Sequence, residues 1–200
     1  MNKKFVISQI KDLRLTNRMF VMITLSVILI ASIGSVTAEE EMSTYRNNEY
    51  GFSVDYPEDW TMVECYMGNI MGDVAFFLGH GVYAIVGVED LPREMTPDEY
   101  ITSAIKELRS GVSSVTCLET GITCVYPMNV VETFNDTING EPVAGSIYTI
   151  GFRGAESKQM LAAFVNDKTA YLITFTAPLD IYDKAEVEYF EPMLHSFRFS

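Results

Sequence analysis

Residues 48–60 read NEYGFSVDYPEDW, and this stretch decides the fold of the chain. Phe52, Val54 and Tyr56 alternate with polar residues, which is typical of a strand with one buried face. Pro57 cannot donate a hydrogen bond to a sheet, so it ends the strand, and the two acidic residues after it favour a turn. The stretch therefore predicts the first strand and turn of a sheet.

The same alternation continues through most of the chain. Trp60 begins the return strand, which runs to residue 65. We expect its indole to fill space beneath a helix, with stacking on a ligand as the alternative. Further strands are predicted at 74–78, 82–89, 129–134, 143–152, 159–165 and 170–176, with a short hairpin at 113–126.

Two segments have helical periodicity instead. In residues 96–111, Thr96 as N-cap and Glu99 three residues later form a capping box. In residues 180–199, apolar side chains recur at helical spacing at Val187, Phe190, Leu194 and Phe197. Pro192 inside this segment is expected to kink or divide the helix.

Many antiparallel strands with two main helices indicate an α+β domain, in which helices pack on an antiparallel β-sheet. Three motifs, YGFSVDYPEDW (50–60), AYLITFTAP (170–178) and MLHSFRF (193–199), resemble the PsbP-like family, whose namesake is the extrinsic lumenal subunit of photosystem II. The resemblance covers nearly all of residues 45–199 and implies an α/β/α sandwich. It marks as family-signature core residues Tyr50, Phe52, Tyr56, Pro57 and Trp60.

The chain begins with the parts of an export signal. Residues 1–18 carry five basic side chains against one acidic one, residues 19–36 carry no charge, and small residues lead up to Ala38. Cleavage after Ala38 is one outcome. Retention of 19–36 as an anchor is the other, because its 18 residues approach the roughly 20 that span a bilayer. In both cases the later residues face outward.

These features predict three parts of the chain and an extracytoplasmic location. Residues 1–38 form an export signal or N-terminal membrane anchor helix, residues 39–47 an acidic polar spacer, and residues 48–200 a PsbP-like globular domain. The protein is then secreted, or tethered to the outer face of the cytoplasmic membrane through residues 19–36. This is its only predicted contact with the membrane.

The charge balance excludes one class of partner. The whole chain has a net charge of −13, and the part after residue 38 has −17, because five of the 14 Lys and Arg and one of the 27 acids precede it. A surface of this sign repels phosphate backbones, so we expect no nucleic acid as a partner. The simplest role of the charge is to keep an exported domain soluble.

Cysteine spacing and one sequon give two covalent predictions. If the hairpin 113–126 turns at residues 120–121, Cys117 lies opposite Cys124, within disulfide distance. Export favours such a bridge, whereas Cys65 is left over as a small buried side chain. Asn135 begins the N-x-S/T sequence, a possible glycosylation site in cells that have the machinery.

The sequence contains no recognisable catalytic, cofactor or metal motif. His80 lies in a turn, and His195 is adjacent to Ser196 in a helix, where neighbouring side chains point in different directions. Acids that could share a face near His195 are Asp183, Glu186 and Glu191. They lack the spacing of a calcium loop, and we interpret them as a solvated acidic face.

These observations lead to two functional hypotheses. The first is an exported, non-catalytic interaction domain whose partner is another protein of the cell envelope, without catalytic residues, cofactor or metal. The alternative is a small-ligand receptor or hydrolase that uses a pocket between the sheet and a helix. Fold resemblance alone does not choose between them.

Overall fold

The computed structural model describes residues 41–65, 74–112, 115–116, 123–124, 127–152 and 155–200. The strands are β1 (Met42–Asn47), β2 (Phe52–Pro57), β3 (Thr61–Cys65), β4 (Val74–Gly79), β5 (Val82–Asp90), β6 (Val115–Thr116), β7 (Thr123–Cys124), β8 (Met128–Ile138), β9 (Glu141–Phe152), β10 (Ala155–Asn166), β11 (Thr169–Pro178) and β12 (Arg198–Phe199). The helices are α2 (Pro97–Val112), α3 (Tyr182–Ala185), the π-helix η2 (Glu186–Phe190) and α4 (Glu191–Ser196).

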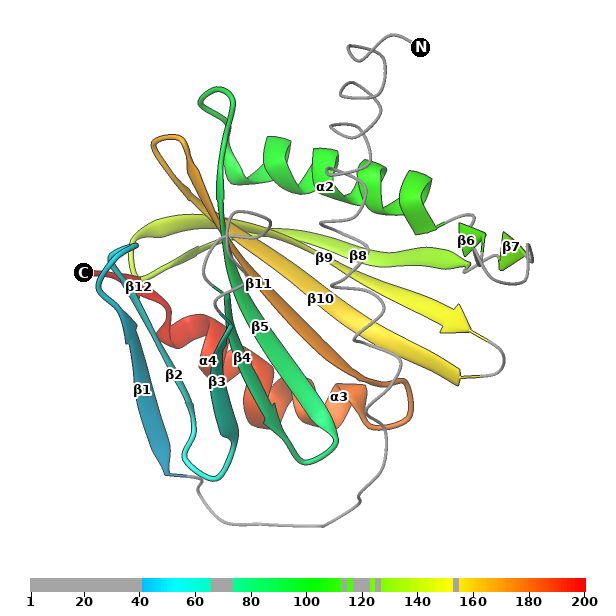
Figure 1. Cartoon of the computed structure of the whole chain (residues 1–200), viewed down its shortest axis with the longest axis horizontal. Coiled ribbons are helices and arrows are strands. Elements are labelled where there is room, and N and C mark those ends of the chain that lie inside the picture. The colour runs from blue at the N-terminus through cyan, green and yellow to red at the C-terminus, as the bar shows by residue number, and fades with distance from the viewer. Residues whose placement is uncertain (1–40, 66–73, 113–114, 117–122, 125–126, 153–154) are drawn as a thin grey trace, which may run out of the picture.

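The main sheet has seven strands in the order β3-β4-β5-β11-β10-β9-β8 (Figure 1). A smaller sheet has the order β1-β2-β12, and β6 pairs with β7 alone. Every pairing in the three sheets is antiparallel, as the sequence predicts.

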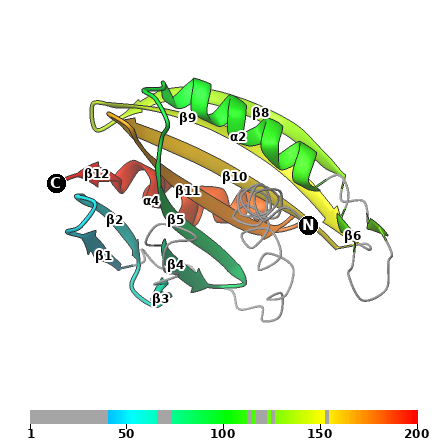
Figure 2. The same ribbon diagram turned by 45° about the horizontal axis from the view of Figure 1, so that its top comes forward.

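Helices lie on both faces of the main sheet (Figure 2). α2 packs on β8, β9 and β10, whereas α3 contacts β11 and α4 contacts β2. The larger core lies on the α3–α4 side and is rich in aromatic rings, for example Phe164 stacked on Phe197 with centroids 4.4 Å apart. The predicted α+β sandwich is confirmed for the described residues.

The opening stretch forms the predicted strand and turn, but the prediction of a single buried face was wrong, because Ser53, on the face expected to be polar, is 1% exposed. Phe52 and Val54 are buried and Tyr56 is half-buried. The Trp60 amide donates to the Pro57 carbonyl oxygen at 3.0 Å, which closes the turn. Trp60 is 4% exposed and packs against Tyr189 of η2, so it is a core side chain beneath a helix.

The capping box at the start of α2 is present. The Glu99 amide donates to Thr96 Oγ1 at 3.2 Å, and the Thr96 amide donates to Glu99 Oε2 at 3.1 Å. The bond that the Thr96 amide donates is the largest cause of a lowered pKa of the Glu99 carboxyl, and the hydrogen bond with Arg93 is the next. The face of the helix that packs on the sheet consists of Tyr100, Ile101, Ala104 and Leu108, with Ile105 partly buried.

The last helical segment is divided as Pro192 predicts. A π-helical turn, η2, lies directly before α4, in which the proline occupies the first turn. Proline lacks the amide hydrogen that an α-helix needs at this point. The assignment of Val187 to the buried face was wrong, because Val187 is 65% exposed. It lies two residues after the buried Ala185, and that spacing places it on the opposite side of a helix.

Three segments differ from the sequence-based boundaries. Residues 42–47, within the expected polar spacer, form β1, and residues 198–199, expected in the last helix, form β12 on β2. In the β6–β7 ladder Cys124 pairs with Val115, so the register is shifted by two residues from the predicted one. The predicted export signal or anchor, residues 1–38, lies outside the described residues, among which no helix is long and apolar enough to cross a bilayer.

Candidate functional site

A row of side chains crosses the main sheet on the face that carries α2. Tyr148 of β9 lies opposite Gln159 of β10, and Gln159 lies opposite Thr176 of β11. Thr176 in turn lies opposite Tyr83 of β5. Because directly opposed residues project from the same face, these four side chains are neighbours, and we call them the polar row.

The polar row is buried, yet its hydrogen-bonding capacity is only partly used. Gln159 is 2% exposed and Thr176 is 3% exposed. The Tyr148 hydroxyl donates to Gln159 Oε1 at 2.7 Å, which turns the amide nitrogen away from this bond. Gln159 Nε2 and Thr176 Oγ1 find no partner in the described part of the chain. Buried polar groups are normally paired, so this pair is the best candidate for a binding position.

Apolar side chains border the polar row at both ends. At one end lies the cluster beneath α2, which includes Ile150 and Leu161. At the other end a separate small cluster joins the buried Tyr83 and Ile85 to the half-buried side chains of Phe76 and Leu78. Because α2 packs on β8, β9 and β10, it covers only the first of these ends.

The next described row on this face, like the polar row itself, is uncharged. The next row on the same face consists of Ser146, Leu161, Thr174, Ile85 and Phe76. Neither row contains a carboxylate, an amine or a guanidinium. Burial raises the pKa of Tyr148 above its ordinary value, so its hydroxyl stays a neutral donor. The row is therefore suited to neutral hydrogen-bonding groups and not to ions.

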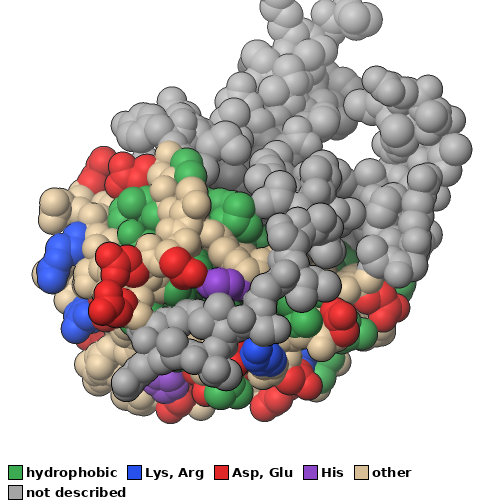
Figure 3. All heavy atoms as spheres, turned by 90° about the horizontal axis from the view of Figure 1, so that it is seen from below, with side chains coloured by type: hydrophobic (Ala, Val, Ile, Leu, Met, Phe, Trp, Pro, Cys, Tyr) green, Lys and Arg blue, Asp and Glu red, His purple; other side chains and the backbone are tan. Residues whose placement is uncertain are grey.

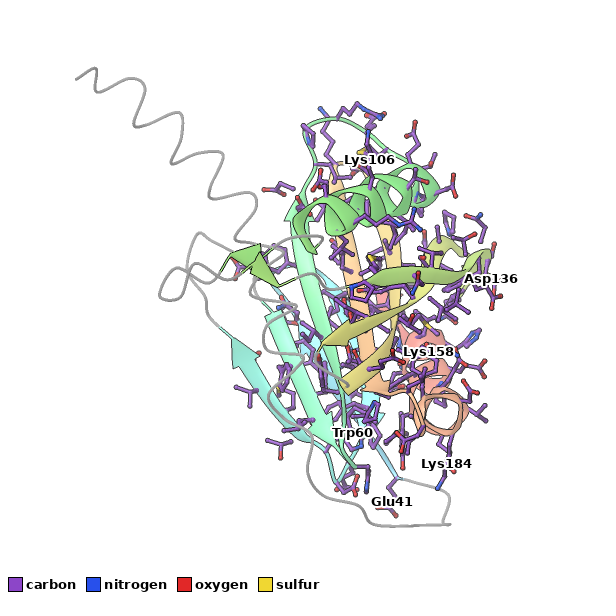
Figure 4. The ribbon with its side chains drawn as sticks, turned by 90° about the vertical axis from the view of Figure 1, so that its right-hand side faces the viewer. Glu41, Trp60, Lys106, Asp136, Lys158 and Lys184 are labelled. Carbon is purple, nitrogen blue, oxygen red and sulfur yellow. The ribbon has the colours of Figure 1, made fainter. Side chains whose placement is uncertain are left out.

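A second polar cluster, on the opposite face, is complete in itself. Lys158 of β10 lies beside α3 (Figure 4), where its Nζ is 2.8 Å from Asp183 Oδ1 and 4.2 Å from the centre of the Tyr182 ring. The Tyr182 hydroxyl donates to Glu186 Oε1 at 3.3 Å. Burial raises the pKa of Glu186, and Lys158 opposes this rise. The cluster attaches the last helix to the sheet.

The two histidines lie where the sequence places them. His80 occupies the β4–β5 turn with φ of 52°, its Nε2 lies 2.8 Å from Asp59 Oδ2, and its ring stacks on Tyr189. His195 lies on α4. The neighbouring Ser196 hydroxyl donates to the Met193 carbonyl oxygen at 2.6 Å. The Ser196 hydroxyl also accepts a hydrogen bond from the Asp55 amide of β2 at 2.8 Å, which connects the helix to that strand.

Two of the acids near His195, Asp183 and Glu186, belong to the cluster around Lys158 and Tyr182. Asp183 pairs with Lys158, and Glu186 accepts from Tyr182, whereas Glu191 begins α4 on an exposed face. No group of three or more His, Cys, Asp or Glu side chains in the described residues could hold a metal ion. Acidic side chains are scattered over the face in Figure 3.

The covalent predictions remain predictions. Cys117 lies outside the described residues, and only the backbone pairing of Cys124 is described, so the bridge between them is not tested. Asn135 lies on the exposed edge strand β8, and its Nδ2 is 3.5 Å from Asp98 Oδ1. The five signature residues are buried or half-buried around β2.

The fold is similar to solved structures, although no family model matches the chain and no curated protein matches it. One is the solution structure of cyanobacterial PsbP (CyanoP) from Synechocystis sp. PCC 6803, with a TM-score of 0.61, 14% identity, and coverage of 85% of this chain and 98% of that one. Another is LpqN of Mycobacterium tuberculosis, described as involved in cell envelope biogenesis, with a TM-score of 0.52, 8% identity, and coverage of 82% and 92%. The chain therefore has the PsbP-like fold that its motifs predict.

Proposed function

We propose that this protein is exported and acts outside the cytoplasm as a non-catalytic interaction domain, bound to another protein of the cell envelope. The observation that carries the proposal is the fold similarity to CyanoP and to LpqN, the second of which is described as involved in cell envelope biogenesis. The basic and apolar segments at residues 1–36 support the same location from the sequence alone.

The interior of the fold supports an interaction role. Aromatic side chains fill the space between the sheet and the last helix, as in the stacked pair Phe175 and Phe190, 4.8 Å apart. The Ser196 hydroxyl, which could otherwise act as a nucleophile, is hydrogen-bonded to the backbone. The Lys158 amine is likewise paired with Asp183. The described residues thus hold these groups in structural roles.

The outer surface suits a polar, reversible interface. The large apolar side chains that are exposed lie on separate elements of the described chain, namely Met42, Val63, Val131, Leu179 and Val187. An obligate interface would instead present them together. With a net charge of −17 after residue 38, a partner with a basic contact surface is the best match.

Two measurements test the proposal. A reporter enzyme that is active only outside the cytoplasm, fused after Ser200, is expected to be active, and the same fusion without residues 19–36 inactive. Reciprocal capture between the full chain and one identified envelope protein is then expected, and it should weaken as salt rises. An unrelated exported domain of similar charge is the control. An inactive full-length fusion, or capture equal to that control, would contradict the proposal.

A further inference from the structure

The proposed interaction function does not account for the unpaired polar atoms of the polar row. Two neighbouring polar atoms, Gln159 Nε2 and Thr176 Oγ1, are buried without a hydrogen-bond partner in the described residues. Each such group loses its bonds to water on folding and gains nothing in return. The two atoms lie side by side in the middle of the main sheet, and a partner that is not part of these residues would satisfy both of them.

The available atoms define what that partner offers. The Gln159 nitrogen has hydrogens to donate, so it requires an acceptor oxygen. The Thr176 hydroxyl both donates and accepts, so it can take a hydrogen from a neighbouring N–H. An amide group presents an acceptor oxygen and a donor nitrogen that are bonded to the same carbon. The bond from Tyr148 to Gln159 Oε1 holds the Gln159 amide in a fixed orientation.

The surroundings define the rest of the partner. Neither the polar row nor the row beside it contains a charged side chain, and moving an ion into such a place is costly. Phe76 and Leu78, at the end that α2 does not cover, remain half-buried and offer apolar surface next to Tyr83. An apolar chain attached to the polar group would lie there.

We propose that this face of the sheet binds a small uncharged amide with an apolar chain, the amide pairing with Gln159 Nε2 and Thr176 Oγ1 and the chain lying on Phe76 and Leu78. This binding site is independent of the proposed interaction function, because it uses the α2 side of the sheet and needs no protein partner.

Octanamide is the probe, and octanoate and octylammonium are its charged controls of equal chain length. In the full chain labelled with nitrogen-15, the side-chain NH₂ signal of Gln159, assigned by its loss in Gln159→Leu, is followed by NMR. Octanamide is expected to shift this signal saturably, together with backbone amides of β10 and β11. The two charged probes are expected to leave it unchanged.

A matched pair of variants locates the contact. Thr176→Val removes the hydroxyl and is expected to weaken octanamide binding about three- to tenfold, the worth of one hydrogen bond. Thr174→Val makes the same change on the same strand and face, one row away, and is expected to leave binding unchanged. Thr176→Ser keeps the hydroxyl and should retain binding.

Four results would overturn the proposal. Octanoate could bind as well as octanamide, which would mean unselective apolar binding. The two valine variants could weaken binding equally. The Gln159 signal could show contacts with water alone and no response to octanamide, which would mean an ordered water only. It could also show contacts with a methyl group of the chain itself, which would mean that the protein fills the site.

Discussion

Replacing Gly79 with alanine tests how tightly Trp60 is held at the corner between β3, β4 and the last helix. A Cβ atom at Gly79 would lie 2.3 Å from Trp60 Cδ1 and 2.6 Å from both Cγ and Nε1. Side chains in proteins do not approach so closely, so the ring or the strand has to move. The indole cannot move freely, because its centroid lies 5.4 Å from that of Tyr189, which stacks in turn on His80.

The expected cost follows from this confinement. Overpacking a core by one methyl group destabilises a protein by about 1–3 kcal/mol. Three ring atoms are affected here and Trp60 is only 4% exposed, so we expect the upper part of that range, about 2–3 kcal/mol. With a slope of about 2–3 kcal/mol per molar urea, the unfolding midpoint should fall by roughly 1 M.

Urea unfolding of the full chain, followed by circular dichroism and by fluorescence, measures the effect. Trp60 is the only tryptophan, so its emission reports the environment of this one ring. Gly151→Ala is the matched control, because its Cβ would meet only the flexible Glu156 side chain at 3.3 Å, and we expect a change within about 0.5 kcal/mol. If Gly79→Ala left both the midpoint and the emission unchanged, the packing described here would be wrong.

Three further predictions follow from single contacts. Val187→Lys should change the free energy of unfolding by less than about 0.5 kcal/mol, because Val187 is 65% exposed. Phe190→Ala should lower it by about 3–5 kcal/mol, because Phe190 is fully buried. Equal changes for the two variants in urea unfolding would refute the helix register. Thr96→Ala should lower the free energy of unfolding by about 1 kcal/mol through loss of the cap, and it should speed hydrogen exchange in the first turn of α2. Thr96→Ser keeps the hydroxyl and should have neither effect. Equal exchange rates in the two variants would count against the capping box. Burial raises the pKa of Tyr148 above 10.0, so the folded state keeps a proton that the unfolded state loses. The stability that Tyr148 contributes is therefore fully present below about pH 10 and is lost as the pH rises further. The free energy of unfolding, measured between about pH 8 and 11, should fall less steeply at the alkaline end in Tyr148→Phe than in the unchanged protein.

Local patterns in the sequence predicted what depends on local chemistry. Alternation in residues 52–57 gave a strand, the Thr96 and Glu99 spacing gave a helix start, and Pro192 gave a divided helix. β1 was not predicted because, of its six residues, only Tyr45 is fully buried, and a single buried position produces no periodic signal.

Local sequence patterns did not predict the polar row, although the pairing of Gln159 with Thr176 could have been predicted from the hairpin that joins their strands. The loop 166–169 sets the β10–β11 register, and that register places Gln159 opposite Thr176. The pairing of Thr176 with Tyr83 joins residues 93 positions apart (176 − 83), and no local pattern encodes it. The missing hydrogen-bond partners depend on every neighbour at once, so only three-dimensional packing reveals them.

Strand β2 has partners from both extremes of the described chain, β1 on one side and β12 on the other. The Ser200 amide also donates to the Gly51 carbonyl oxygen at 2.9 Å, just before β2 begins. If the residues after the signal cross a membrane in the order of the sequence, this three-stranded layer assembles only after residue 199 has emerged. Until then Phe52 would lack its stacking partner Phe197, so the chain would cross the membrane before this layer of the domain is folded.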